Sequence, residues 1–338
     1  MVADLYVNES DNNCTQVDLL MKRYYLPIMY SIIFAVGLVG NTMSIIIYVA
    51  KMRPWKSSSI ITLNLALTDL LYVLSMPFLV YYYTHGDSWT MGEFMCRFVR
   101  LGFHINLYGS ILFLACLSVF RYVALVHPLR LGLVQRKRWG VTACLLVWAA
   151  SSTEIAPMLT MITVVEKANR TYCLDFASND PDEVWWYGSL LTVLGYAVPL
   201  VVVFLCYLRI AWALSEGPPA GCPSRTRVRR LTVLILTLFV VCFMPYHVLR
   251  LLRVDSRRRK VSCMTWRWVH AAYILSRPVA GLNTFFNLAL YTMAGDRFQH
   301  AFFDLFSWDC CRSKPTTGLQ VAVIDTPASS SICNFEGK

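Results

Sequence analysis

The apolar residues of this chain lie in long blocks separated by short polar stretches, rather than at the spacing of a soluble core. A helix needs roughly 20 mostly apolar residues to cross a bilayer. Seven blocks reach that length, and they predict membrane-spanning helices over residues 24–50, 58–84, 93–126, 139–162, 185–214, 228–252 and 266–292. We therefore expect an all-α membrane protein, a seven-transmembrane helix bundle over residues 24–292, preceded by a polar tail over residues 1–23.

Composition agrees with a membrane protein. Only 15% of the 338 residues are charged, whereas soluble domains carry about a quarter. The net charge of +11 does not indicate a nucleic-acid partner, because the basic residues cluster at membrane edges, where they orient helices and meet anionic lipid. Residues 1–22 lack the apolar core of a cleaved signal peptide, so we expect the first span to direct insertion.

Seven spans place the two termini on opposite sides of the membrane. The N-terminal side carries the features of an oxidising compartment, namely three glycosylation sequons and four cysteines: Asn8, Asn13, Asn169, Cys14, Cys96, Cys173 and Cys263. Disulfides persist only in such compartments. We therefore expect a multi-pass plasma-membrane protein with an extracellular N-terminus.

Basic residues mark the opposite side as cytoplasmic. Lysines and arginines are concentrated in the three loops of that side, which follow spans one, three and five, as the positive-inside rule requires. The run 257–260 is basic but falls outside. It either concentrates anions near the mouth of the bundle or is simply a solvated loop.

The last part of the chain predicts two further segments. Residues 293–311 form a short amphipathic helix eight that ends at Cys310 and Cys311, which are candidate palmitoylation sites. Residues 312–338 are polar and predict a disordered cytoplasmic tail.

Polar residues inside the spans are the most informative, because each is costly in hydrocarbon unless it faces the bundle interior and finds a partner. They fall into an inner group and an outer group. The inner group is Asn41, Asp69, Ser110, Arg121, Asn283 and Asn287, and the outer group is Arg100, His104, His247, Arg250 and Arg277.

The outer group predicts an anion site. Arg100 and His104 share one helix face at spacing i, i+4, and His247 and Arg250 share another at i, i+3. Guanidinium groups bind carboxylates through two parallel hydrogen bonds, so three converging arginines favour a small anion with two charges. The alternatives are that Arg250 extends to the lipid headgroups, that Arg277 pairs with Asp175, and that the histidines are ordinary buried donors.

Several runs resemble the rhodopsin-like (class A) G-protein-coupled receptors. They are Gly40-Asn41, the run Leu65 to Asp69, Trp148, Pro199, Tyr207 and the run Phe239 to Pro245. The resemblance covers residues 24–311. It implies a heterotrimeric G protein, with an arrestin as a further partner, engaging Arg121. It also implies that Tyr207 and Tyr291 close behind this arginine, with Phe243 as the aromatic toggle.

Three departures from that family weaken the expected restraint of the resting state. Phe120 replaces the acid before Arg121, Leu288 replaces the proline after Asn287, and Phe243 replaces the usual tryptophan. The hypothesis that follows is elevated activity without ligand.

The family resemblance extends to the inner group. Asp69, Ser110, Asn283 and Asn287 look like the family's sodium pocket, a water-filled hydrogen-bond network being the alternative; no other cofactor is expected. We pair Cys96 with Cys173 and Cys14 with Cys263.

Within the family the chain resembles the purinergic-like branch, most of all the receptors for 2-oxoglutarate. The runs that carry this likeness include 51–58, 247–250 and 276–278. It implies a receptor for 2-oxoglutarate or a close dicarboxylate that signals through Gq and calcium. One carboxylate would be held by Arg100 and His104 and the other by Arg250 and Arg277, with His247 nearby and a rim of Tyr30, Tyr83 and Tyr273. Asp175 belongs to the expected site as well, because a bridge to Arg277 could hold the outer loop over it.

Rival functions are weaker. Succinate, a nucleotide or a cysteinyl leukotriene would use the same arginines, although Ile274 stands where nucleotide receptors often carry Gln or Lys. A transporter would show internal repeats, and we find none. We find no HExxH, GxSxG or phosphate-loop motif and no histidine cluster, so an enzyme is not expected.

Overall fold

The computed structural model describes residues 17–167, 170–215, 223–294 and 298. Several predicted features lie outside the described residues. These are Asn8, Asn13, Cys14, Asn169, Cys310, Cys311, most of the segment 293–311 and the tail 312–338.

The described chain is almost entirely helical. Span one is α1 (Val17–Leu20), η2 (Met21–Tyr25) and α2 (Leu26–Ala50), span two is α3 (Ser57–Thr84), and span three is α4 (Gly92–Val126). After η3 (Pro128–Arg130) and α5 (Leu131–Val134), span four is α6 (Lys137–Ile155) with α7 (Met158–Met161). Span five is α8 (Pro181–Thr192), η5 (Val193–Ala197) and α9 (Val198–Ser215), and span six is α10 (Pro223–Thr237), η6 (Leu238–Phe243) and α11 (Met244–Arg258). Span seven is α12 (Cys263–Gly281) with α13 (Asn283–Ala294).

Six of these described spans are long and apolar enough to cross a membrane by length and composition alone. Span seven falls short of that measure, since its helix is interrupted at Leu282 and carries Arg267 and Arg277. All seven nevertheless coincide with the predicted segments to within a few residues at most ends. The prediction of an all-α, seven-helix membrane bundle is confirmed.

Span six extends about five residues beyond its prediction at each end, from Pro223 to Arg258, and the start of span one also differs. The sequence predicts a tail that reaches residue 23, but the helix of span one already begins at Val17. The physical reason is an ion pair: the Asp18 carboxylate accepts two hydrogen bonds of 3.0 Å from Nη1 of Arg267. It also meets Nδ1 of His270 at 3.2 Å, which fixes this polar turn against span seven.

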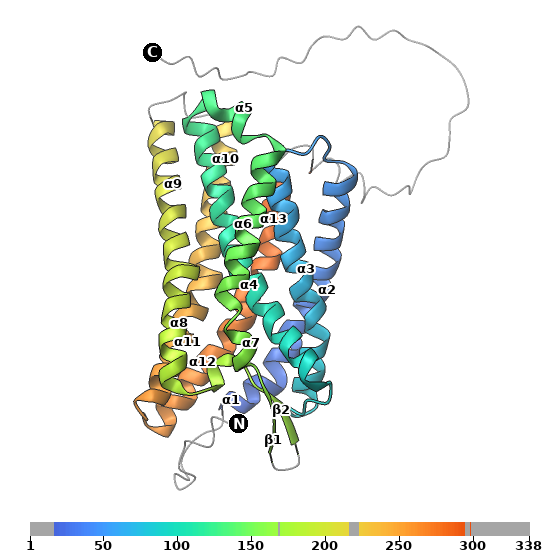
Figure 1. The fold of residues 1–338 in the computed structure, drawn as a ribbon, viewed down its shortest axis with the longest axis vertical. Helices are drawn as coiled ribbons and strands as arrows, with labels where there is room; N and C mark the ends of the chain where they lie inside the picture. The colour runs from blue at the N-terminus through green and yellow to red at the C-terminus, as the bar shows by residue number, and fades with distance from the viewer. Residues whose placement is uncertain (1–16, 168–169, 216–222, 295–297, 299–338) are drawn as a thin grey trace, which may run out of the picture.

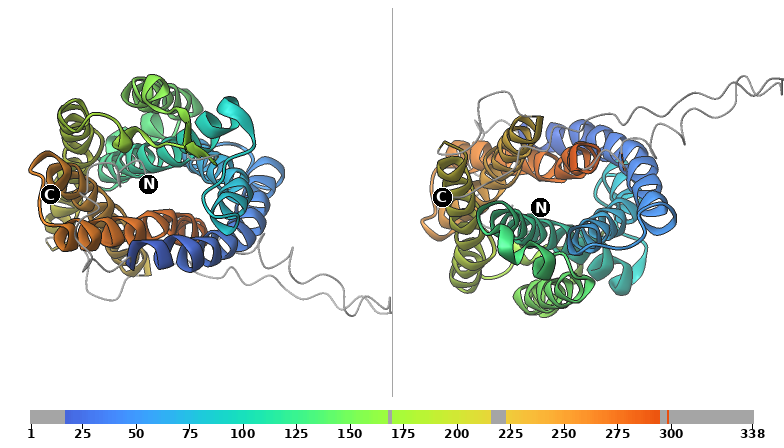
Figure 2. Two further views of the ribbon diagram at one scale, coloured as in Figure 1. Left: turned by 90° about the horizontal axis from the view of Figure 1, so that it is seen from below. Right: turned by 90° about the horizontal axis from the view of Figure 1, so that it is seen from above.

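The spans stand side by side and form an oval ring when viewed along the bundle (Figures 1 and 2). Span one packs against spans two and seven, span two against three and four, span three against four and five, and span six against five and seven. The hairpin of β1 (Val164–Lys167) and β2 (Arg170–Cys173) lies with α1 at one end, and α5 lies at the other (Figure 1). We call these the outer and inner ends.

Three described segments are π-helical, and each lies just before a proline. They are η2 before Pro27, η5 before Pro199 and η6 before Pro245. Proline has no N–H, so the carbonyl four residues earlier loses its helical partner. The local widening of the helix follows from that loss, and such segments often mark functional sites.

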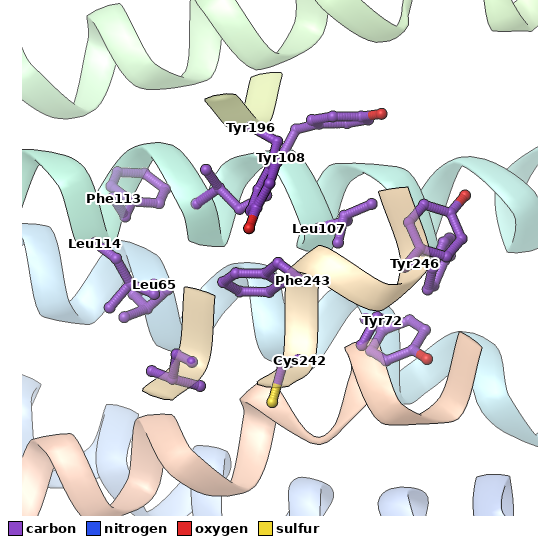
Figure 3. Close-up of a cluster of buried hydrophobic side chains, with 14 of the residues drawn as sticks. Leu65, Tyr72, Leu107, Tyr108, Phe113, Leu114, Tyr196, Cys242, Phe243 and Tyr246 are labelled. Atoms are coloured by element: carbon purple, nitrogen blue, oxygen red, sulfur yellow. The ribbon is translucent and has the colours of Figure 1, made fainter. Parts of the chain in front are cut away.

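The bundle is apolar outside and partly polar inside. Leu145, Leu146 and Phe204 are more than half exposed on its outer surface, which suits a lipid environment. Asp69 and Asn287 are fully buried within it. Aromatic side chains from spans two, three, five and six fill the core between these spans (Figure 3).

Candidate functional site

A cavity of about 80 Å³ opens toward the outer end of the bundle. The described residues that line it come from spans one, two, three, six and seven and from the loop after β2. Its charged and aromatic members are Lys22, Tyr82, Tyr83, Asp87, Arg100, Tyr172, Asp175, Arg253, His270, Tyr273 and Arg277. If His270 is left aside, the lining therefore contains four cationic side chains and two carboxylates.

Arg100 projects from span three into this cavity. Its Nη2 donates to the backbone oxygen of Cys173 at 2.7 Å, so the disulfide-linked hairpin positions it. Its Nη1 and Nε are buried and have no hydrogen-bond partner among the described residues. A buried charged donor without a partner is costly, so an anion in the cavity would lower the free energy of this site.

Arg277 enters the same cavity from span seven. Its Nη1 donates to the Tyr83 hydroxyl at 3.1 Å. The ring of Tyr30 packs on that of Tyr83 with centroids 6.2 Å apart, so Tyr30 supports the site from behind and does not line it. Span two thereby holds Arg277 in place.

Asp175 closes the cavity from the loop after β2. One carboxylate oxygen accepts from the Phe176 N–H at 2.9 Å and the other from the Tyr273 hydroxyl at 3.4 Å. Burial raises the pKa of Asp175, but the positive charges of Arg100 and Arg277 nearby outweigh burial and hold this pKa below its ordinary value. The alternative of a direct ion pair with Arg277 is not realised among the described contacts.

The other three residues of the predicted site lie elsewhere. His104 donates from Nδ1 to the Arg100 carbonyl at 2.9 Å and accepts at Nε2 from Tyr246, so both its nitrogens are engaged. Arg250 and His247 are fully buried and do not line the cavity. Arg250 therefore does not extend to the headgroups, and the structure does not bring it together with Arg277.

Sequence reasoning missed Arg253, Lys22 and His270, which do line the cavity. Arg253 follows Arg250 by three residues and therefore shares its helix face one turn farther out. That spacing was a usable signal. Lys22 and His270 gave none, because their positions depend on the contact between the first turns of span one and span seven.

The basic run 257–260 is not a solvated loop throughout. Arg257 donates to the backbone oxygens of Ala177 and Asn179 at 2.7 and 3.0 Å. Arg258 pairs with Asp182 at 2.7 Å. These contacts attach the outer end of span six to the segment that carries Asp175.

A second cavity, of about 500 Å³, opens at the inner end. Arg121 lines it together with residues of spans one, two and three and with α5. Nη1 of Arg121 donates to the Tyr207 hydroxyl at 3.3 Å, as the resemblance predicts. Tyr291 instead donates to Asp69 at 3.3 Å, so it does not close behind Arg121 here. Phe243 is fully buried and packs edge-on against Phe239.

Asp69 is the centre of a buried polar network midway through the bundle. It accepts from Asn106 at 2.7 Å and from Asn287 at 2.9 Å, and Asn106 also donates to Ser110 at 3.4 Å. Oδ1 of Asn287 is buried without a partner among the described residues. These oxygens are the ligands that a hard cation prefers. Asn283 is buried beside this network, and its side-chain oxygen accepts from the neighbouring threonine hydroxyl at 3.5 Å.

Cysteine pairing can be followed for three of the four outer residues. Cys96 and Cys173 form a disulfide, which ties span three to β2 as predicted. Cys263 is also disulfide-bonded. Since Cys14 lies outside the described residues, its pairing with Cys263 stays a prediction.

A ring of membrane helices with a cationic cavity at one end and an arginine-containing cavity at the other defines a seven-helix membrane receptor. The family comparison agrees. The model of the rhodopsin family of 7 transmembrane receptors matches residues 40–291, so the chain belongs to that family. It is a family of receptors that bind a ligand and couple to G proteins, and not one of enzymes.

Individual relatives are similar over most of the chain. The 2-oxoglutarate receptor 1 of Rattus norvegicus is 50% identical over 291 residues, or 86% of each protein. The 2-oxoglutarate receptor 1 of Mus musculus is 49% identical over the same share. A purinoceptor of Meleagris gallopavo is 36% identical over 86% of this chain and 82% of its own.

Proposed function

We propose that this protein is a cell-surface receptor for 2-oxoglutarate or a closely related dicarboxylate, which it binds at the outer cavity. The charge of the cavity carries the proposal. Its four cationic and two acidic side chains leave an excess of two positive charges, which matches a dianion. Two relatives about half identical to this chain are named for 2-oxoglutarate, which supports the same ligand.

The size of the cavity favours a small dicarboxylate over the larger alternatives. Pockets for drug-sized ligands measure about 300–1,000 Å³, whereas this one measures about 80 Å³. A five-carbon diacid suits such a space better than a nucleotide or a cysteinyl leukotriene. The relatives named as purinoceptors are also less similar to the chain. Succinate remains the rival of comparable size and charge.

The roles that we propose for the individual residues differ from those expected from the sequence. Arg100 offers its unpartnered N–H groups to one carboxylate. Arg277 and Arg253 hold the other, with Tyr83 and Tyr273 at the walls. His104 lies beneath the cavity, where its hydrogen bonds to the Arg100 carbonyl and the Tyr246 hydroxyl hold spans three and six together. In this proposal it does not contact the ligand.

The inner cavity is the proposed site of the G protein, of the Gq class, and of an arrestin. Arg121, Tyr207, Phe243 and Tyr291 are the residues through which activation reaches it. A ligand shifts this equilibrium only by its differential affinity for the two states of the bundle. Movement of Tyr291 from Asp69 to a position behind Arg121, which Tyr207 already contacts, is the inner event that such a shift would produce.

An allosteric sodium ion is a further proposal. Asp69, Ser110 and Asn287 supply oxygens of a suitable kind, and Asn283 borders the network. The same oxygens also suit the alternative, a network of bound water.

The topology that we propose places the N-terminus and the outer cavity outside the cell. The disulfide of Cys96 with Cys173, at the outer end, supports this topology because it requires an oxidising compartment. Glycosylation at Asn8, Asn13 and Asn169, and palmitoylation at Cys310 and Cys311 in contact with lipid, belong to the same proposal. So do the tail 1–23, the helix 293–311 and the cytoplasmic tail 312–338.

A calcium assay in cells that express the receptor tests the proposed ligand. We expect a dose-dependent response to 2-oxoglutarate at lower concentration than to succinate, and none to nucleotides or cysteinyl leukotrienes. Parallel assays with a Gq inhibitor test the coupling. A response to a nucleotide but to no dicarboxylate would contradict the proposal.

A further inference from the structure

Arg250 connects three spans through one buried guanidinium. From α11 its Nη1 donates to the Tyr108 hydroxyl on α4 at 2.6 Å. Its Nη2 donates to the Gly188 carbonyl at 3.1 Å and to the Thr192 hydroxyl at 2.9 Å, both on α8. Thr192 in turn donates to the same Gly188 carbonyl. In a site of such low polarity these bonds are strong and costly to break.

An aromatic layer separates Arg250 from the ligand cavity. Its guanidinium carbon lies 5.6 Å from the ring centroid of Phe176 and 5.5 Å from that of Tyr246. Phe176 directly follows the cavity residue Asp175, and Tyr246 packs on the cavity residue Tyr273 at 5.8 Å. A ligand in the cavity therefore borders the same layer from the opposite side and does not reach Arg250.

Spans five and six are connected again, nearer the middle of the bundle. The Tyr196 hydroxyl in η5 donates to the Phe239 carbonyl in η6 at 3.1 Å. Its ring stacks on His247 at 4.7 Å, and Figure 3 shows Tyr196 and Tyr108 side by side above Phe243. Both segments are π-helical and precede a proline, so they are the places where these spans bend most readily.

We infer that Arg250 is a positioning residue, a clamp that fastens the outer ends of spans three, five and six and transmits ligand binding to span six. The inference rests on the proposed function, because the ligand is taken to occupy the outer cavity. Displacement of Phe176 or Tyr246 by a ligand alters the cation–π contacts of Arg250. Because the outer ends of spans three, five and six stay fastened together, spans five and six respond by bending at η5 and η6. This bending moves the inner end of span six.

Two substitutions weaken the clamp in different places. Arg250→Lys keeps the charge but loses the planar fork of donors. Thr192→Val keeps the shape of the side chain and removes one acceptor. Thr153→Val is the matched control, because the Thr153 hydroxyl is exposed and bonds only its own helix at Ala149.

The first measurement separates binding from activation in reconstituted receptor. Binding of labelled 2-oxoglutarate without G protein should stay within about twofold of wild type in both variants. Maximal ligand-driven nucleotide exchange on the G protein should fall at least fivefold for Arg250→Lys and about twofold for Thr192→Val. The double variant should resemble Arg250→Lys alone, since both changes break the same contact. A tenfold loss of binding in Arg250→Lys, with a normal Thr192→Val, would show that Arg250 contacts the ligand and overturn the inference.

The second measurement needs no ligand. Hydrogen exchange of the amides in residues 188–196 of the unliganded receptor should accelerate in Arg250→Lys and Thr192→Val but not in Thr153→Val. Unchanged exchange in both clamp variants would overturn the inference. If wild type fails to respond to 2-oxoglutarate, the proposed ligand is wrong, and hydrogen exchange still decides the clamp. If Arg250→Lys fails to fold, Thr192→Val decides it.

Discussion

Nη1 of Arg277 donates to the hydroxyl of Tyr83, 3.1 Å away, and so joins span seven to span two at the wall of the outer cavity. The two residues are separated by 194 positions in the chain. Both are buried, so the bond fixes the direction of a guanidinium that would otherwise have several rotamers open to it.

Removing this bond should reduce potency without abolishing it. Tyr83→Phe should lower the potency of 2-oxoglutarate about tenfold, because a hydrogen bond to a charged group contributes about 1.5–3 kcal/mol. Arg277→Ala should abolish the calcium response while surface expression persists. Arg259→Ala, which breaks an exposed ion pair with Asp255, is the control and should leave potency unchanged. Loss of surface expression in Arg277→Ala would make that residue structural.

Arg253 should behave as a ligand contact, in contrast to Arg250. Arg253→Gln removes a charge from the cavity wall and should lower dicarboxylate binding about tenfold, with Arg253→Lys partly restoring it. The direct binding assay applies here as well. Arg259→Gln, on the same helix end but with an exposed side chain, is the matched control. Binding that stays normal in Arg253→Gln would place the ligand elsewhere.

The ion pair of Asp18 with Arg267 should stabilise the receptor more than any exposed pair. Asp18 is 1% exposed and also meets His270. Breaking a buried pair costs about 3–5 kcal/mol, so Asp18→Asn should clearly lower the temperature of thermal unfolding in detergent. Asp182→Asn removes the partner of Arg258 at the surface and should cost about 0–1 kcal/mol. Equal shifts for the two variants would contradict this prediction.

Asp175 should make the outer loop sensitive to acid. Its pKa is held below the ordinary value of about 3.9 by the neighbouring positive charges, despite burial. A carboxyl whose pKa is lower in the folded state contributes stability above the unfolded pKa, and this stability is lost as pH falls through the folded pKa. Unfolding measured from pH 7 to pH 3 should therefore show a loss of stability below about pH 5. Asp175→Asn should flatten that loss and be less stable at pH 7; an unaltered pH profile would argue against an ionised Asp175.

The cavity illustrates which site residues could be predicted from the sequence. Arg100 and Arg277 were identified because a charge inside an apolar span must face the interior. Arg250 met the same criterion and does face the interior, but its described hydrogen-bond partners are Tyr108, Gly188 and Thr192, and it does not line the outer cavity. Burial alone cannot distinguish an arginine that lines a cavity from one that is enclosed by other side chains.

The sequence by itself determined the seven spans, their order and the interior position of their polar residues. Hydropathy is a local property, and a length of roughly 20 apolar residues is imposed by the bilayer. Only the tertiary structure decided that Arg253 lines the outer cavity while Arg250 does not. The physical reason is depth: both arginines lie on one face of α11, but Arg253 is one helical turn nearer the outer end, whereas Arg250 lies beside the rings of Phe176 and Tyr246. The position of Lys22 and His270 likewise depends on Asp18 meeting Arg267, a contact between residues 249 positions apart that no local pattern records.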